Sequence, residues 1–193
     1  CLRDLDSAFS REEIVKKVLG VIPARFAATR FPGKPMALIQ GKPMIQWVIE
    51  GTRKTQSLSE LLVATDDDRI ARAAEAAGVR AIMTPSSLPS GTDRIFAAIR
   101  DQAADVVVNI QGDEPLIKPE MLEELIAPML SLDAPEMSTL STDLDADELQ
   151  NPNVVKALVD QKGHAIYFSR FPVPYSRTQA SGTPVSRKHV GLY

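Results

Sequence analysis

The sequence predicts an α/β fold, in which helices flank a mainly parallel sheet and a β-rich insertion follows in the second half of the chain. Two observations support this prediction. Up to residue 110, short aliphatic runs alternate with segments whose apolar residues recur every three or four positions. Beyond residue 130, strand-like runs follow one another in quicker succession. Strands that alternate with helices imply right-handed crossovers, which cover both faces of a parallel sheet.

Four runs are expected to form the parallel sheet, because each is aliphatic or β-branched and is flanked by turn or charge signals: residues 18–22, 61–65, 79–83 and 106–110. The helices expected between them are residues 44–54, 68–77 and 92–100. Asp68 lies near an expected helix start, and Gly78 lies just past an expected helix end. The side chains of Met44 and Trp47 are expected in the core.

The second half is expected to open with a helix at residues 119–130 and to continue with strands at residues 136–141, 154–159 and 164–168. Residues 160–163, with the sequence Asp-Gln-Lys-Gly, are expected to form a hairpin turn. His164, in this hairpin, is interpreted as a structural residue.

Composition indicates one compact domain. The chain has 193 residues, of which 44% are hydrophobic, and a net charge of −3, which argues against nonspecific nucleic-acid binding. No apolar run is long enough to cross a bilayer, and Cys1 is the single cysteine, so a cytoplasmic protein without membrane partners is expected. The chain lacks an initial methionine and stops in an extended apolar stretch. We therefore interpret residues 1–17 as a polar extension and residues 18–193 as one domain truncated at its C-terminus.

The segment after the first expected strand combines cations with residues that restrict the backbone. Arg25, Arg30 and Lys34 lie on a stretch that contains Pro23, Pro32, Pro35 and Gly33, so their charges can be presented to an anion at little ordering cost. The small residues Ala27 and Ala28 leave backbone N–H groups approachable for phosphate oxygens. This loop predicts a polyphosphate site; the alternative is a surface turn with solvated charges.

Ligands of open parallel sheets bind outside the carboxyl ends of the strands, and two further loops at that edge carry carboxylates. Asp66 follows the second strand and either orients a ligand or caps the next helix. Asp113 follows a buried strand beside Gly112, where a carboxylate can hold Mg²⁺ against phosphates. The alternative for Asp113 is an ordinary acidic turn.

Seven motifs occur in sequence order: VIPAR at 21–25 with FPGKP at 31–35, ATD at 64–66, SGTDR at 90–94, NIQGDEP at 109–115, NPNVVK at 151–156, YFSR at 167–170 and HVGLY at 189–193. Together they resemble those of the 3-deoxy-manno-octulosonate cytidylyltransferase family, whose sugar acid is abbreviated Kdo. The resemblance covers the chain from about residue 18 to its end.

The resemblance implies a Rossmann-like nucleotidyltransferase fold similar to that of glycosyltransferase-A proteins. It implies a reaction in which the anomeric hydroxyl of Kdo attacks the α-phosphorus of CTP, giving CMP-Kdo and pyrophosphate with Mg²⁺ as cofactor, for lipopolysaccharide synthesis. In such a transfer the protein supplies mainly positioning and charge neutralisation. The family also implies a homodimer with contacts from the β-rich part.

The resemblance assigns roles to particular residues. Arg25, Lys34 and Asp113 are the expected catalytic residues; Lys34 neutralises charge in the transition state and Asp113 binds the metal. The expected nucleotide-binding residues are Ala24, Arg25, Arg30, Lys34, Ser90, Gly91, Thr92 and Arg94. The expected sugar-binding residues are Gln111, Arg170, His189 and Tyr193, of which Arg170 suits a carboxylate. Arg94 could equally be a solvated cation, and Lys156 either reaches the nucleotide or is an exposed strand lysine.

The sequence departs from the family pattern at two places. Ser87, Leu88 and Pro89 stand where the family has an acidic residue and a histidine before the Ser-Gly-Thr motif. The family also continues beyond Tyr193 with a segment that supplies a second metal-binding aspartate, so the chain as given is expected to turn over slowly or not at all. Two other functions stay open: a cytidylyltransferase for another sugar acid, such as sialic acid or 8-amino-Kdo, and a non-catalytic nucleotide-binding module.

Overall fold

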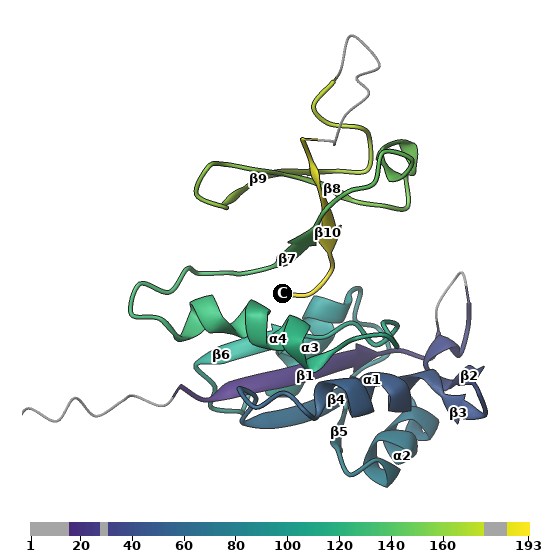
Figure 1. Cartoon of the computed structure of the whole chain (residues 1–193). Helices are drawn as coiled ribbons and strands as arrows, with labels where there is room; N and C mark the ends of the chain where they lie inside the picture. Colours follow the sequence, from purple (N-terminus) through teal and green to yellow (C-terminus); the bar gives the residue numbers. More distant parts are fainter. Residues whose placement is uncertain (1–15, 28–30, 176–184) are drawn as a thin grey trace, which may run out of the picture.

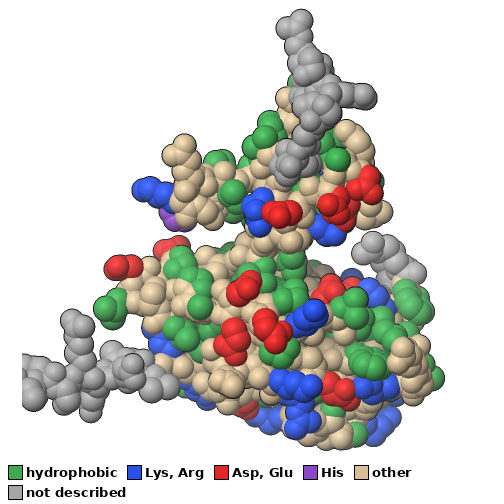
Figure 2. All heavy atoms as spheres, in the orientation of Figure 1, with side chains coloured by type: hydrophobic (Ala, Val, Ile, Leu, Met, Phe, Trp, Pro, Cys, Tyr) green, Lys and Arg blue, Asp and Glu red, His purple; other side chains and the backbone are tan. Residues whose placement is uncertain are grey.

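The computed structural model describes residues 16–27, 31–175 and 185–193. Its larger part is a four-stranded parallel sheet with the strand order β5-β4-β1-β6. A second, antiparallel sheet with the order β7-β10-β8-β9 stands beyond this α/β layer, and the chain end at Tyr193 lies between the two (Figure 1). On the face shown in Figure 2, acidic and basic side chains are interspersed over the α/β layer, and a narrower waist joins it to the second sheet.

The parallel sheet confirms the α/β prediction, and the strands and helices that form it match the expected ones to within a few residues. Its strands are β1 (Val18–Ala24), β4 (Glu60–Thr65), β5 (Arg80–Met83) and β6 (Val106–Asn109). The connecting helices are α1 (Met44–Thr52), α2 (Asp68–Ala76) and α3 (Gly91–Ile99), and α4 (Pro119–Ile126) follows β6.

Both faces of this sheet are covered, as parallel sheets require. On one face, buried residues of α1, α2 and α4 form the larger core cluster with alternate strand residues such as Val18, Ile22 and Val63. On the other face, Ile95 and Ala98 of α3 pack on Leu19, Val21 and Leu62. The predicted core position of Met44 is confirmed, because its side chain is buried, whereas Trp47 is half-buried and donates from Nε1 to the Ile39 carbonyl at 3.0 Å.

The second sheet is formed by β7 (Leu140–Thr142), β8 (Lys156–Val159), β9 (Ala165–Ser169) and β10 (Arg187–Val190). All its pairings are antiparallel. After β10 the chain returns to the first sheet, where Tyr193 and Asn109 exchange both backbone hydrogen bonds, at N–O distances of 2.7 and 3.4 Å. The β-rich second half is therefore connected to the edge strand β6.

Several predicted boundaries were wrong. The expected helix 119–130 is α4 followed by a 3₁₀ helix, Ala127–Leu130, because Pro128 has no N–H to continue the α-helical hydrogen bonds. The expected strand 136–141 shrinks to β7. The expected strand 154–159 begins only at Lys156, because Asn151 starts a turn that is stabilised by its side chain accepting from Asn153 N.

Three short strands were not predicted. β2 (Leu38–Ile39) and β3 (Lys42–Pro43) form a hairpin whose two turn residues, Gln40 and Gly41, both have positive φ, at 51° and 78°. β10 lies in the middle of its sheet, between β7 and β8. A two-residue strand carries too little pattern to be recognised, and β10 contains Arg187 and Lys188, which are poor strand signals.

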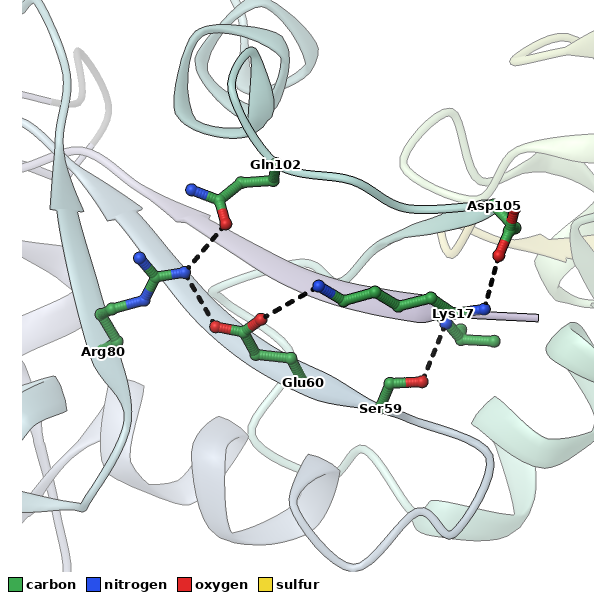
Figure 3. Close-up of polar contacts among 7 residues, drawn as sticks. Lys17, Ser59, Glu60, Arg80, Gln102 and Asp105 are labelled. Atoms are coloured by element: carbon green, nitrogen blue, oxygen red, sulfur yellow. Dashed lines mark hydrogen bonds and ion pairs between the residues drawn. The ribbon is translucent and has the colours of Figure 1, made fainter. Parts of the chain in front are cut away.

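Polar contacts connect all four parallel strands at their N-terminal ends (Figure 3). Glu60 at the start of β4 binds Arg80 of β5 at 2.8 Å and lies 3.9 Å from the ammonium of Lys17, which precedes β1. The backbone N–H of Lys17 donates to Asp105, next to β6, at 2.7 Å.

Among the described residues, no helix is both long and apolar enough to span a bilayer. The opposite, carboxyl edge of the sheet contains the site described next.

Candidate active site

A cavity of about 530 Å³ opens at the carboxyl edge of the parallel sheet. It lies between the loop after β1, the loop after β6 and the start of α3. Its lining residues are Pro23, Ala24, Arg25, Phe31, Lys34, Pro35, Ser90, Gly91, Arg94, Gln111, Gly112 and Asp113. The cavity thus brings together most of the residues that the sequence assigned to catalysis and nucleotide binding.

The loop after β1 is closed at its base by one backbone contact. The N–H of Gly33 donates to the carbonyl of Phe26 at 2.7 Å, and Gly33 adopts a positive φ of 71°. A Cβ at Gly33 would lie 3.0 Å from the Phe26 ring, so glycine suits both the backbone conformation and the contact. Arg25 and Lys34 leave the two ends of this loop and both line the cavity. Arg30 lies outside the described residues.

Lys34 and Asp113 connect the loops after β1 and β6. The Lys34 ammonium and the Asp113 carboxylate Oδ2 are 2.5 Å apart, and both side chains are partly exposed to the cavity. Within the described parts of the chain, no three His, Cys, Asp or Glu residues gather in a group that could hold a metal ion. Asp113 therefore faces the cavity as a single carboxylate beside a cation.

Gly112 allows the β6 loop to approach β1 closely. A Cβ at this position would lie 2.8 Å from the backbone oxygen of Pro23, which is closer than non-bonded atoms approach. Gly91 also faces Pro23, where a Cβ would lie 3.3 Å from the proline ring. A side chain at Gly112 would therefore force the two loops, which both line the cavity, to shift.

The N-terminus of α3 borders the cavity through Ser90 and Gly91. Ser90 is the N-cap of this helix, and its hydroxyl accepts from the backbone N–H of Asp93 at 3.1 Å. Thr92 does not line this cavity. It lines a second cavity of about 510 Å³ beside β6, together with Tyr193. The structure therefore separates Thr92 and Tyr193 from the residues with which the sequence grouped them.

Arg94 is not a solvated cation. Its side chain is 2% exposed; Nη2 lies 3.0 Å from Asp66 Oδ2, and Nη1 donates to the hydroxyl of Thr84. Asp66 is not the cap of α2 either, because Asp67 holds that position and accepts from Arg69 N at 2.9 Å. Asp66 and Asp67 are adjacent in the sequence, and the fold directs Asp66 to Arg94 and Asp67 to the start of α2.

Among the expected sugar-binding residues, Gln111 lines the first cavity, and a Cβ on Gly191 would lie 4.0 Å from its Cγ. His189 lies near this junction with its ring between those of Phe168 and Tyr193, at centroid distances of 4.7 and 5.5 Å. Its Nε2 is 2.9 Å from the Thr139 hydroxyl. Burial lowers the pKa of His189 below its ordinary value, because the charged ring would lose hydration.

Arg170 and Lys156 do not line the cavity; in the second sheet, Lys156 is the first residue of β8 and Arg170 directly follows β9. Arg170 is exposed and donates from Nη1 to the carbonyl of Pro152 at 3.0 Å. The prediction of an exposed lysine at 156 was wrong, because its side chain is fully buried and its ammonium donates to three carbonyls, those of Asn151, Val154 and Arg170, at 2.6 to 3.1 Å. Burial also lowers the pKa of Lys156. Sequence patterns miss such a residue, because backbone carbonyls leave no motif.

Comparison with known proteins decides the family. The cytidylyltransferase family matches residues 19–193 of this chain. The 3-deoxy-manno-octulosonate cytidylyltransferase of Bdellovibrio bacteriovorus is 51% identical over 180 residues, which are 92% of this chain and 73% of that protein. The enzyme of the same name from Acaryochloris marina is 46% identical over 91% of this chain and 72% of its own length. The chain belongs to the 3-deoxy-manno-octulosonate cytidylyltransferase family.

Solved structures agree with this membership. A CMP:2-keto-3-deoxy-manno-octonic acid synthetase complexed with CTP superposes with a TM-score of 0.85 at 42% identity, covering 92% of this chain and 73% of that one. A cytidylyltransferase from Leptospira borgpetersenii superposes with a TM-score of 0.55 at 24% identity over 61% of this chain and 50% of its own, which shows a shared fold. The nucleotidyltransferase fold and the cytidylyltransferase function predicted from the sequence are thereby confirmed.

Sequence reasoning did not single out four residues that shape this family's cavity in the present chain. Pro23, Phe31 and Pro35 line it, and Thr84 fixes Arg94 beneath it. The three lining residues belong to the VIPAR and FPGKP motifs, so the motif itself was a usable signal. Thr84 lies just past β5 and carries no comparable signal, because its role depends on a hydrogen bond to a side chain ten residues away.

Proposed function

We propose that this chain transfers CMP from CTP to Kdo in the cavity between the loops after β1 and β6, with release of pyrophosphate. The Lys34–Asp113 pair carries the proposal, because it places a cation and a carboxylate face to face at the edge where parallel sheets bind ligands. Transferring the negative charge of a triphosphate from water into a pocket without cations would cost much free energy. Cations at fixed positions can stabilise both this charge and the charge that develops on the leaving pyrophosphate.

Arg25 and Lys34 are the proposed ligands of the triphosphate. Both emerge from the closed base of one loop, so little ordering is required when phosphate binds. Arg30 remains a proposed third cation on the same loop. Ala24, Ser90 and Gly91 line the same cavity, and their backbone groups are the proposed neighbours of the cytosine. Because the guanidinium of Arg94 is paired with Asp66, it borders this region as a neutralised group.

Mg²⁺ is the proposed cofactor, and Asp113 is its proposed protein ligand. The donor set fits this ion, because Mg²⁺ is usually bound by one or two carboxylates together with substrate phosphates and water. When bound, Mg²⁺ would neutralise charge on the phosphates. The contact with Lys34 would also hold the Asp113 carboxylate toward the cavity, where the ion would bind.

The sugar acid is proposed to bind on the side of the cavity where the second sheet meets β6. Gln111 lines the cavity there, and the segment containing His189 and Tyr193 lies beside it. The neutral imidazole of His189 can hydrogen-bond a sugar hydroxyl without repelling a cation nearby. Arg170 stays a proposed partner of the Kdo carboxylate, because a guanidinium binds a carboxylate in bidentate fashion.

A homodimer formed through the second sheet is the proposed assembly. Large hydrophobic side chains are exposed on β9 and in the segments beside it: Ile166, Tyr167, Phe168, Phe171, Tyr175 and Val185. β9 is also an edge strand, which can accept a partner. Location in the cytoplasm stays a prediction from the sequence.

The decisive substitution is Lys34→Ala. With saturating Kdo and Mg²⁺, we expect kcat/KM for CTP to fall by about 10²- to 10³-fold, because one preorganised cation is lost from the transition state. Pyrophosphate release measures the rate. Lys42→Ala is the matched control, because Lys42 pairs with Glu50 and lies over the Trp47 ring, outside the cavity. Equal rates for Lys34→Ala and the parent protein would contradict the proposal.

The alternatives are separated by the acceptor. We expect pyrophosphate release with Kdo, and none with sialic acid or with no acceptor. Release with 8-amino-Kdo but not with Kdo would retain the nucleotide chemistry and change the substrate. Binding of CTP without release in the presence of any of these acceptors would favour the non-catalytic module.

A further inference from the structure

Asp66 binds one end of the loop that carries Arg25 and Lys34. In the parallel register of β1 and β4, Ala24 pairs with Thr65, so Asp66 lies beside the first residues after β1. Its Oδ1 accepts a hydrogen bond from the backbone N–H of Phe26 at 3.2 Å, and its Oδ2 accepts one from Arg94 at 3.0 Å. One buried carboxylate therefore contacts both the loop and helix α3.

Phe26 determines how the two cations leave this loop. Its N–H donates to the Asp66 carboxylate, and its carbonyl accepts from the N–H of Gly33. The guanidinium of Arg69 lies over its ring, 3.5 Å from the centroid. Arg25 directly precedes Phe26, and Lys34 directly follows Gly33. Because both backbone groups of Phe26 are fixed, the directions of Arg25 and Lys34 depend on this residue.

Arg94 fixes Asp66 in turn. The two side chains are 2% and 7% exposed, so their orientations are set by the protein rather than by water. The Thr84 hydroxyl accepts from Arg94 Nη1 and donates to the carbonyl of Thr65, at the end of β4, at 3.0 Å. A chain of contacts thus runs from β5 through Arg94 and Asp66 to Phe26. Removing one charge of such a pair leaves the other buried and unpaired, which is costly.

We propose that Asp66 is a positioning residue for the triphosphate. It holds Phe26, and through Phe26 the cations Arg25 and Lys34, in the geometry that binds the phosphates, and Arg94 keeps its carboxylate in place. The inference rests on the proposed function, because it takes the loop as the binding site of the CTP triphosphate. Its physical basis is preorganisation, since a loop that is already ordered loses less entropy when the ligand binds.

Two double variants test the role of the Phe26 contact. Asp66→Asn with Arg94→Met and Asp66→Leu with Arg94→Met both remove the two buried charges together, so neither leaves a charge unpaired. Asn retains an oxygen that can accept from Phe26 N–H, whereas Leu does not. Isothermal titration calorimetry measures the binding of CTP and of CMP to each variant, and thermal unfolding shows whether each is folded.

We expect CTP to bind about tenfold more weakly to the Leu variant than to the Asn variant, as the loss of one buried hydrogen bond predicts. CMP lacks the β- and γ-phosphates, so its affinity should be the same for both. Equal CTP affinities in two folded variants, or equal losses for CTP and CMP, would overturn the proposal and leave Asp66 a purely structural residue. If the Leu variant does not fold, Thr84→Val replaces it and must weaken CTP binding more than CMP binding.

Controls separate this inference from the proposed function. Glu60→Gln removes a carboxylate from another ion pair at the opposite end of β4 and should leave the affinity for CTP unchanged. If Lys34→Ala leaves CTP binding unchanged, the loop does not bind the triphosphate, and the proposed function is refuted together with the role of Asp66. If Lys34→Ala weakens CTP binding while the two double variants bind CTP alike, only the role of Asp66 is refuted.

Discussion

Arg94 and Lys156 are two cations that the structure buries completely, and each meets its requirement for hydrogen bonds differently. Arg94 donates to the carboxylate of Asp66 and the hydroxyl of Thr84, whereas Lys156 donates to three backbone carbonyls. A buried cation without such partners would destabilise the fold severely. Their burial explains why residue type alone misled the sequence interpretation, since Arg and Lys are exposed at most positions in proteins.

His189 offers a test of the environment around the proposed sugar site. Because burial lowers its pKa below the ordinary value of 6.5, more than half of the imidazole should be neutral at that pH. We expect Phe168→Ala, which removes the neighbouring ring, to raise the pKa toward 6.5 by admitting water. An NMR titration of the ring protons measures it. His164, which is exposed on the hairpin, is the only other histidine and acts as an internal reference.

The same shift fixes the sign of a pH effect on stability. Below about pH 6.5 the unfolded chain binds a proton at this histidine before the folded protein does. His189 should therefore leave the free energy of unfolding unaffected above that pH and lower it progressively as the pH falls through the folded pKa. Phe168→Ala should weaken this dependence. Urea unfolding at several pH values measures it, and a pKa for His189 at or above 6.5 in the parent protein would contradict the interpretation.

At the scale of elements, the two ends of the parallel strands differ in what they contribute. The carboxyl edge presents loops to the cavity, whereas the N-terminal edge carries the ion pairs of Glu60, Arg80 and Lys17 that connect neighbouring strands (Figure 3). Parallel register needs support at this edge, because adjacent strands are not joined by tight turns. Each contact is partly exposed, and its contribution to stability is correspondingly small.

A double-mutant cycle on Glu60→Gln and Arg80→Met tests this edge. We expect each substitution to lower the free energy of unfolding by less than about 1 kcal/mol. The coupling energy between the two substitutions should be a few tenths of a kcal/mol, and added salt should reduce it further. Urea denaturation gives the values, and kcat/KM for CTP should stay unchanged because the cavity is at the opposite edge. Additive effects, or a coupling that persists in high salt, would argue against an exposed ion pair.

Sequence patterns predicted the regular elements well where period and caps agreed. The four parallel strands and the helices α1, α2 and α3 follow from aliphatic runs and three-to-four spacing. The patterns missed the short strands β2, β3 and β10, and they misplaced the bounds of β7 and the end of α4, where Pro128 changes the helix type. In these places the apolar period is too short or is interrupted by a single residue, so the pattern gives no reliable boundary.

At the scale of the whole molecule, the second sheet ends in the edge strand β9, and several large apolar side chains on and beside this strand are exposed. Ile166 on β9 is 68% exposed and Phe171 is 80% exposed. The proposed homodimer would bury such side chains, and association through an apolar patch is driven by the area removed from water. The monomer described here would then be one half of the functional assembly.

Ile166→Glu tests the assembly. We expect the parent chain to run as a dimer in light scattering after size exclusion and the variant to shift to a monomer, because a buried charge opposes association. Leu132→Glu is the matched control, since Leu132 is 97% exposed but lies outside the second sheet. A monomeric parent chain, or a variant that remains dimeric, would exclude this surface as the interface.

The sequence by itself determined the fold class, the family and the loops that form the cavity, because these depend on local period and on motifs whose residues are close along the chain. Only the tertiary structure decided that Asp66 rather than Asp67 points inward, that Arg94 is neutralised, that Lys156 is enclosed by carbonyls and that Thr92 and Tyr193 face a different cavity. These outcomes depend on which groups from distant segments share a buried space. Such partners are set by packing, and packing has no period along the sequence.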